Sequence, residues 1–173
     1  DKEIAAQRSR LGMVFQRFNL WPHKTVLENV MLGQMVVSGK DKETARKKAI
    51  ETLTRVGLAA KAEDYPVRLS GGQQQRVGIA RAFVASPKII FADEPTGNLD
   101  SKTTMEVLRL MQRIVREQQQ TLVMVTHDNY IAGFADRQFH IVDGKILKIE
   151  EKKKETQEAV QEMQDALHRG EES

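Results

Sequence analysis

Two short clusters of residues in this chain have the composition of a site for phosphate chemistry. The first is Leu69-Ser70-Gly71-Gly72-Gln73, in which neighbouring glycines after a serine allow the backbone to approach an anion closely. The helical pattern that follows places these backbone N–H groups at a helix N-terminus, where anions bind. The second is the acid pair Asp93-Glu94, which ends an apolar run. Carboxylates at the carboxyl end of a buried strand lie where doubly wound sheets place their ligands.

The spacing of apolar residues predicts strands and helices in alternation. A short apolar run at residues 11–15 is typical of a strand. The continuously apolar runs at 88–93 and 121–126, with a helix expected between them, are typical of strands in a parallel sheet covered on both faces. Thr25, with Glu28 three residues later, is expected to cap a helix. Other helices are expected at residues 41–57, from the serine-glycine cluster to Pro87, and around 107–115, with a hairpin over 139–149 that turns at Asp143-Gly144. The expected fold class is α/β, with helices covering a mostly parallel sheet on both sides.

Composition and charge exclude several classes of protein. The 173 residues carry a net charge of only +3, so no nucleic-acid partner is expected. Acidic residues flank the single basic run, Lys152-Lys153-Lys154, which is typical of a solvated helix face. The chain has no cysteine, hence neither disulfides nor thiolate metal ligands. No apolar run approaches the ~20 residues that span a bilayer, so membrane association is expected only through a partner subunit.

Five motifs, in this order along the chain, resemble those of ATP-binding cassette (ABC) ATPases. They are similar to that family's Q-loop, signature, Walker B, D-loop and switch segments. In this sequence they are Gln16, Leu69-Ser70-Gly71-Gly72-Gln73, Asp93-Glu94, Gly97-Asn98-Leu99-Asp100 and His127. The resemblance covers residues 11–147 and implies a P-loop NTPase-type sheet, with a helical subdomain over about residues 25–86.

The resemblance also implies a role for each motif residue, with ATP and Mg²⁺ as ligands. Asp93 and Gln16 would contact Mg²⁺, Glu94 would activate the attacking water, and His127 would donate to the γ-phosphate. The signature residues would bind the γ-phosphate held by a second ABC subunit, and the D-loop with Asp100 would cross to that subunit. These signature residues are Ser70, Gly71, Gly72 and Gln73. A transmembrane permease is the further partner that the family implies, which would hold the subunit at the cytoplasmic face of the membrane.

The chain contains no Gly-x-x-x-x-Gly-Lys-Ser/Thr, the Walker A loop that holds nucleotide phosphates. We therefore interpret residues 1–149 as a partial ABC domain whose first third, roughly, would precede Asp1. This polypeptide by itself is expected to be inactive. Residues 150–173 are expected to form a charged amphipathic helix and tail, with an apolar stripe of Ala159, Val160, Met163 and Leu167.

Several alternatives stay open at this point. The segment after Asp93 is similar to the ATPases of lipoprotein-release and macrolide-export systems, whereas residues 18–32 look more like polar amino-acid transporters. A chromosome-maintenance ATPase would place a long coiled coil between the Q-loop and the signature, but only 54 positions (70 − 16) separate Gln16 from Ser70 here. A translation-associated ABC ATPase and a truncated, non-catalytic fragment are the remaining readings.

Overall fold

A computed structural model describes residues 10–152 of the chain. These residues form two compact units, one extending to Val125 and the other beginning at Thr126. The helix expected over residues 150–173 lies almost wholly outside the described residues, and its role stays a prediction.

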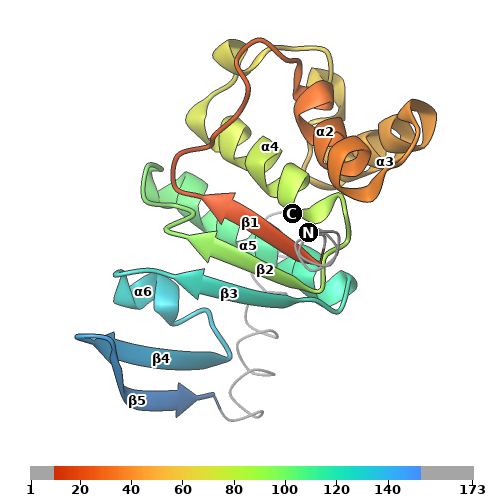
Figure 1. Ribbon diagram of the computed structural model, residues 1–173. Coiled ribbons are helices and arrows are strands. Elements are labelled where there is room, and N and C mark those ends of the chain that lie inside the picture. The colour runs from red at the N-terminus through yellow and green to blue at the C-terminus, as the bar shows by residue number, and fades with distance from the viewer. Residues whose placement is uncertain (1–9, 153–173) are drawn as a thin grey trace, which may run out of the picture. The chain divides into compact units, whose positions relative to one another are not determined.

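The first unit is built on a three-stranded parallel sheet in the order β1-β2-β3 (Figure 1). Its strands are β1 (Leu11–Phe15), β2 (Ile89–Asp93) and β3 (Thr121–Val125), which confirms the three strands expected from the sequence. The last residues of all three strands are register partners, because Phe15 pairs with Asp93 and Asp93 pairs with Val125. The carboxyl ends of the strands therefore form one edge of the sheet, called here the carboxyl edge.

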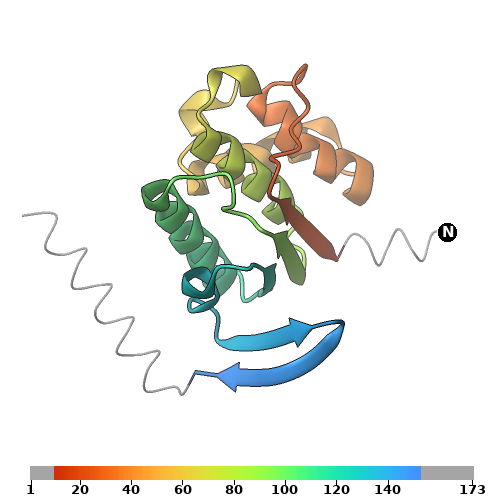
Figure 2. The same ribbon diagram turned by 90° about the vertical axis from the view of Figure 1, so that its left-hand side faces the viewer.

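Helices occupy most of the chain between the strands. Figures 1 and 2 show α2 (Val26–Ser38), α3 (Lys42–Arg55) and α4 (Gly71–Phe83) gathered beyond β1, whereas α5 (Ser101–Glu117) lies across one face of the sheet. Two short 3₁₀ turns, η1 (Ala59–Lys61) and η2 (Pro66–Arg68), connect α3 to α4. The expected cap of α2 is confirmed, since Thr25 and Glu28 form a reciprocal capping box.

One hydrophobic core joins the helices to the covered face of the sheet. Each large side chain buried in it stabilises the fold by about 1.5–3 kcal/mol. Core residues contributed by the sheet and all four helices include Val14, Val30, Leu53, Ile79, Phe83, Ile90, Met111 and Ile114.

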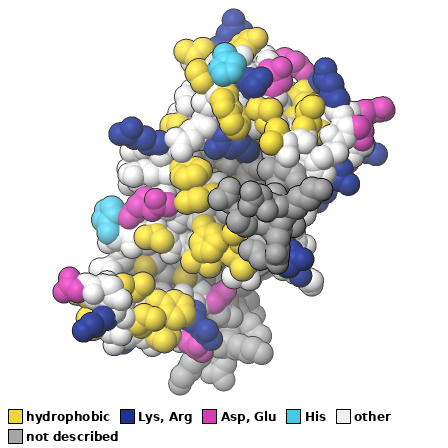
Figure 3. Space-filling model, in the orientation of Figure 1, with side chains coloured by type: hydrophobic (Ala, Val, Ile, Leu, Met, Phe, Trp, Pro, Cys, Tyr) yellow, Lys and Arg dark blue, Asp and Glu magenta, His cyan; other side chains and the backbone are white. Residues whose placement is uncertain are grey.

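The expectation that helices cover both faces of the sheet is wrong for the described residues. One face, with Val14, Ile90 and Ala92, is buried in the core. On the other face the alternate side chains are exposed, and Figure 3 shows hydrophobic side chains in the middle of this face. These exposed residues are Leu11, Met13, Phe91, Val123 and Val125. The continuous apolar runs predicted two-sided burial, but among residues 10–125 the helices pack on one side only.

The second unit contains the short helix α6 (Asn129–Ala132) and an antiparallel hairpin of β4 (Arg137–Val142) and β5 (Lys145–Glu151). The hairpin turns at Asp143 and Gly144, as expected, and both have positive φ angles of 50° and 73°. A two-residue turn with two positive φ angles matches the right-handed twist of its strands. Strand β5 continues to Glu151, so residues 150 and 151 are strand and not the start of a helix. No helix within residues 10–152 is long and apolar enough to cross a membrane.

Candidate functional site

The carboxyl edge brings three of the expected motifs together. Gln16 directly follows Phe15, and Glu94 directly follows Asp93, the register partner of Phe15. The turn after Glu94 lies against Gln16, because a Cβ atom built on Gly97 would come within 2.7 Å of Gln16 Nε2. In addition, Asn98 Nδ2 donates to the backbone carbonyl of Gln16 at 3.1 Å. The Q-loop, Walker B and D-loop residues of the sequence analysis are thus neighbours in the fold.

Glu94 has an unusual backbone conformation that the sequence did not reveal. Its φ angle is 44°, in the left-handed region that non-glycine residues seldom adopt. Two hydrogen bonds hold it there: its N–H donates to the Val125 carbonyl at 3.0 Å, and its carbonyl accepts from the Gly97 N–H at 3.1 Å. A strained backbone held in place by its surroundings is common at functional sites. The side chain of Glu94 is half-buried, and that of Asp93 is exposed at the strand end.

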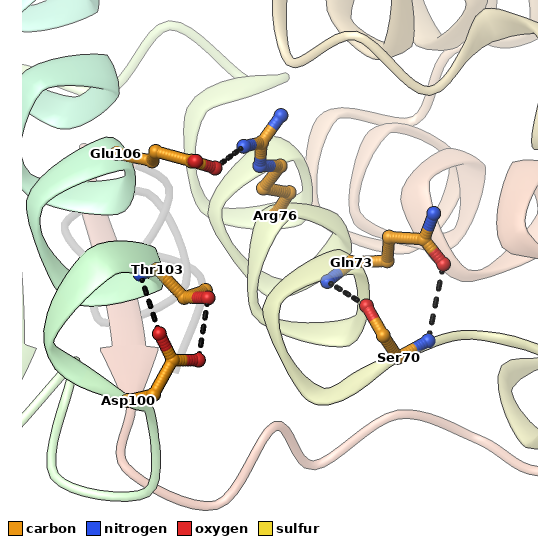
Figure 4. Close-up of polar contacts among 6 residues, drawn as sticks. All are labelled: Ser70, Gln73, Arg76, Asp100, Thr103 and Glu106. Atoms are coloured by element: carbon orange, nitrogen blue, oxygen red, sulfur yellow. Dashed lines mark hydrogen bonds and ion pairs between the residues drawn. The ribbon is translucent and has the colours of Figure 1, made fainter.

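The serine-glycine cluster begins helix α4, as expected. Ser70 is the N-cap, its hydroxyl accepts from the Gln73 N–H at 3.3 Å, and the Gln73 side chain accepts from the Ser70 N–H at 3.0 Å. This capping box occupies both polar side chains of the cluster (Figure 4). The N–H groups of Gly71 and Gly72 have no hydrogen-bond partner within residues 10–152. They are the donors that α4 can offer to an anion.

Gly72 also has a packing role that the sequence analysis missed. A Cβ atom at this position would overlap Thr103 Cγ2 of helix α5, far inside the 3.0 Å that real Cβ atoms respect. Gly71 is different, since its Cβ would make only ordinary contacts with Phe18 at 3.6 Å and Leu99 at 3.7 Å. Glycine at position 72 therefore allows α4 to lie close to α5, whatever it does toward a ligand.

Asp100 is the N-cap of α5. Its carboxylate accepts from the Thr103 N–H at 3.0 Å and from the Thr103 hydroxyl at 2.6 Å. These two donors stabilise the charged form and lower the pKa of the Asp100 carboxyl below its ordinary value. Figure 4 shows the first turn of α4, with Ser70 and Gln73, beside the first turn of α5, with Asp100 and Thr103. Farther along the two helices, Arg76 and Glu106 form an ion pair of 2.7 Å.

His127 lies in the second unit, two residues beyond β3, and its side chain is exposed. The neighbouring Asp128 forms the N-cap of α6, accepting from Tyr130 and Ile131 N–H groups, while its own N–H donates to the Thr126 hydroxyl at 3.1 Å. The local turn around His127 is thus defined. Its role as the switch histidine stays a prediction.

The described residues contain no group of three or more His, Cys, Asp or Glu side chains arranged to hold a metal ion. Mg²⁺ does not require such a group. It commonly binds through one or two carboxylates, with water and substrate phosphates completing its octahedral shell. Asp93, together with Gln16, which directly follows the register partner of Asp93, offers the carboxylate and amide oxygen types that fit this pattern.

The parallel sheet, the capped helices and the acidic end of β2 together define an α/β fold of the kind that binds ligands at its carboxyl edge. Residues 1–97 match the family model described as ABC transporter, and the chain belongs to that family. The chain is 46% identical over 149 residues to the arginine transport ATP-binding protein ArgV of Corynebacterium glutamicum, covering 86% of the chain and 58% of ArgV. It is 52% identical over 130 residues to the glutamine transport ATP-binding protein GlnQ of Escherichia coli, covering 75% of the chain and 52% of GlnQ.

Export proteins match as well. The macrolide export ATP-binding/permease protein MacB of Syntrophobacter fumaroxidans is 46% identical, over 84% of the chain and 21% of MacB.

Among solved structures, a dimeric bacterial ABC transporter cassette, MJ0796, is 42% identical with a TM-score of 0.74, over 87% of the chain and 67% of that cassette. The same cassette has been solved in a post-hydrolysis state bound to ADP and Pi, with the same scores. The expected ABC ATPase fold is confirmed. The chain spans less than two thirds of the length of the transport ATP-binding relatives ArgV and GlnQ.

Proposed function

We propose that this chain is part of an ATP-hydrolysing ABC transporter subunit. Within that subunit, this part holds Mg²⁺ and activates water, and its signature residues complete the ATP site of a second subunit. The observation that carries the proposal is the carboxyl edge, where Gln16 and Glu94 follow paired strand ends and Gly97 packs on Gln16. A parallel sheet places its ligands at this edge. ATP binding is also what the names of the amino-acid transport relatives and of the macrolide export relative share.

The residues at the carboxyl edge supply what phosphoryl transfer to water requires. Asp93 and Gln16 offer the oxygen ligands for Mg²⁺, which, when bound, neutralises the charge on the β- and γ-phosphates. Glu94 orients the attacking water and accepts its proton. The fixed backbone of Glu94 limits where its carboxylate can go, which favours a single geometry for this step.

The signature end of α4 serves the site of a second subunit. The N–H groups of Gly71 and Gly72 donate to a γ-phosphate, and the partial positive charge at the start of a 13-residue helix supports that interaction. Two copies arranged head to tail would complete two such sites. The dimeric state of the solved cassette supports this arrangement.

A membrane permease is the second partner in this proposal. By family resemblance, the loop after Gln16 faces the permease. In the structure this loop presents Trp21, which is 41% exposed, while Arg81 lies over its ring at 5.2 Å and supports it from α4. The subunit would then be peripheral at the cytoplasmic face, with cargo selected by the permease.

The test uses an extended chain, meaning these 173 residues preceded by a phosphate-loop segment of the family that contains no tryptophan. In it, Glu94→Gln is expected to lower ATP turnover by about 100-fold or more, because the general base is lost while the side chain keeps its size. Binding of ATP, followed with a fluorescent analogue, is expected to persist. Glu117→Gln, at the far end of α5, is the matched control and is expected to leave turnover unchanged. Near-normal turnover in Glu94→Gln would remove Glu94 from this role.

A further inference from the structure

Gln75 is a buried polar residue that none of the expected motif roles uses. It lies on α4 and its side chain is completely buried. Its Nε2 group donates to two backbone carbonyls, that of Phe15 at 3.2 Å and that of Pro95. Phe15 is the residue before Gln16, and Pro95 is the residue after Glu94. One amide group thus connects the helix that begins at the signature to both segments of the carboxyl edge.

The hydrogen bonding of Gln75 is incomplete. Its Oε1 atom is buried and has no hydrogen-bond partner within the described residues. A buried polar atom without a partner is unfavourable, so an apolar side chain of the same size would avoid that cost. The advantage of glutamine at this position therefore comes from its two N–H donors, which no apolar residue can replace.

Helix α4 holds the loop after β1 at further points. Arg81, which is also on α4, donates to the carbonyl of Asn19 at 2.6 Å and to that of Phe18 at 3.2 Å. Asn19 has a positive φ angle of 49°, so its carbonyl direction depends on such support. Through Gln75 and Arg81, side chains of α4 bind three backbone carbonyls of the segment 15–19.

On the other side, Glu94 is held by β3 and by its own turn through the hydrogen bonds to Val125 and Gly97. Gln75 adds the constraint on the next peptide, at Pro95. The position of Glu94 relative to Gln16 is therefore defined by hydrogen bonds from β3, the turn and α4 together.

We propose that Gln75 is a positioning residue that fixes Gln16 and Glu94 relative to each other and to α4. A phosphate that binds at the start of α4 acts on the same helix that carries this amide. When a second subunit's phosphate binds at the start of α4, a shift of that helix would be transmitted through Gln75 to Glu94, the water-activating residue of this chain. The inference rests on the proposed function. It adds Gln75 as the residue that connects the chain's own carboxyl edge to the signature end of α4, which serves the site of a second subunit.

The chain offers a matched control for this inference. Gln34, on α2, is also buried, and its Nε2 donates to the carbonyl of Val84, which is not a motif residue, at 2.6 Å. Gln75→Met and Gln34→Met each remove buried amide hydrogen bonds while nearly preserving side-chain volume. Both are expected to lower the melting temperature of the extended chain. Only a positioning role for Gln75 predicts a kinetic difference between them.

In the extended chain, Gln75→Met is expected to lower kcat by about 10- to 100-fold with KM for ATP unchanged, because a small displacement of Glu94 impairs the chemical step more than binding. Gln34→Met is expected to keep kcat. Trp21 is the only tryptophan, so its fluorescence reports the loop that α4 holds. The change in that fluorescence on ATP addition is expected in Gln34→Met and lost in Gln75→Met.

The inference is overturned if Gln75→Met keeps kcat within about threefold, or if kcat and ATP affinity fall together. If Gln75→Met does not fold, Gln75→Asn is used, since its shorter amide cannot reach both carbonyls, and the same loss of kcat is expected. Failure of this inference is distinct from failure of the proposed function. If Glu94→Gln abolishes turnover and Gln75→Met does not affect it, only the role of Gln75 is wrong.

Discussion

Replacing Gly72 by alanine tests the packing between α4 and α5. The new Cβ atom would overlap Thr103 Cγ2. Thr103 cannot easily rotate away, because its hydroxyl donates to Asp100 at 2.6 Å and its side chain is β-branched. Overpacking of this kind typically costs about 1–3 kcal/mol. Alanine in a helix recovers up to about 1 kcal/mol through its higher helix propensity.

Gly71→Ala is the control, since it carries the same gain in propensity without the overlap. The two variants are therefore expected to differ by about 1–3 kcal/mol, with Gly72→Ala the less stable. For an extended chain of more than 150 residues, each kcal/mol corresponds to about 2–4 °C in melting temperature. Calorimetry or thermal unfolding followed by circular dichroism measures this difference.

A second substitution identifies the cause. Thr103→Ser removes Cγ2 but keeps the hydroxyl that donates to Asp100, so Gly72→Ala is expected to be neutral or stabilising in that background. The double-mutant cycle isolates the contact as a coupling free energy. Equal melting temperatures for Gly71→Ala and Gly72→Ala, or no rescue by Thr103→Ser, would refute the packing argument.

Two other predictions concern the helix cap and the nucleotide. The Asp100 carboxyl has a lowered pKa in the folded chain, so the stability it contributes is present above the pKa of the unfolded chain and is lost as pH falls through the lowered value. Asp100→Asn is expected to keep the cap but to flatten the decline in melting temperature at acidic pH; an unchanged decline would contradict this origin. The 173-residue chain, which contains no phosphate loop, is expected to give no binding of a fluorescent ATP analogue at micromolar concentration, whereas the extended chain binds it. Equal binding by the two would contradict the need for that loop.

Periodicity and capping residues were sufficient to predict most of the fold. The three parallel strands, the capping box at Thr25 and the turn at Asp143-Gly144 all follow from local rules, because each depends on residues close together in sequence. The exposed face of the sheet was mispredicted. A continuous apolar run shows that a strand can be buried on both sides, but not which elements cover it.

The positions of the motifs were also predictable, but the contacts that hold them were not. The order of strands in a parallel sheet brings Gln16 and Glu94 to one edge, so their proximity follows from topology. The overlap at Gly72, the hydrogen bond from Glu94 to Val125 and the two hydrogen bonds of Gln75 join residues 20 to 60 positions apart. Such long-range contacts leave no periodic pattern in the sequence.

The central claim is that one chain supplies Glu94 while the other supplies the signature of the same site. The most direct test mixes two inactive extended chains, one with Glu94→Gln and one with Gly71→Asp. Aspartate suits the start of a helix, and a Cβ atom at position 71 meets only ordinary contacts, but the carboxylate repels a phosphate.

When the two variants are combined before ATP is added, a mixed dimer contains one intact site, made of Glu94 from the Gly71→Asp chain and Gly71 from the other. About half of the dimers are mixed and each has one of two sites, so about a quarter of the unmodified turnover is expected to return. If the mixture stays as inactive as each variant alone while the mixed dimer is shown to form, the signature acts within its own chain and the account is contradicted.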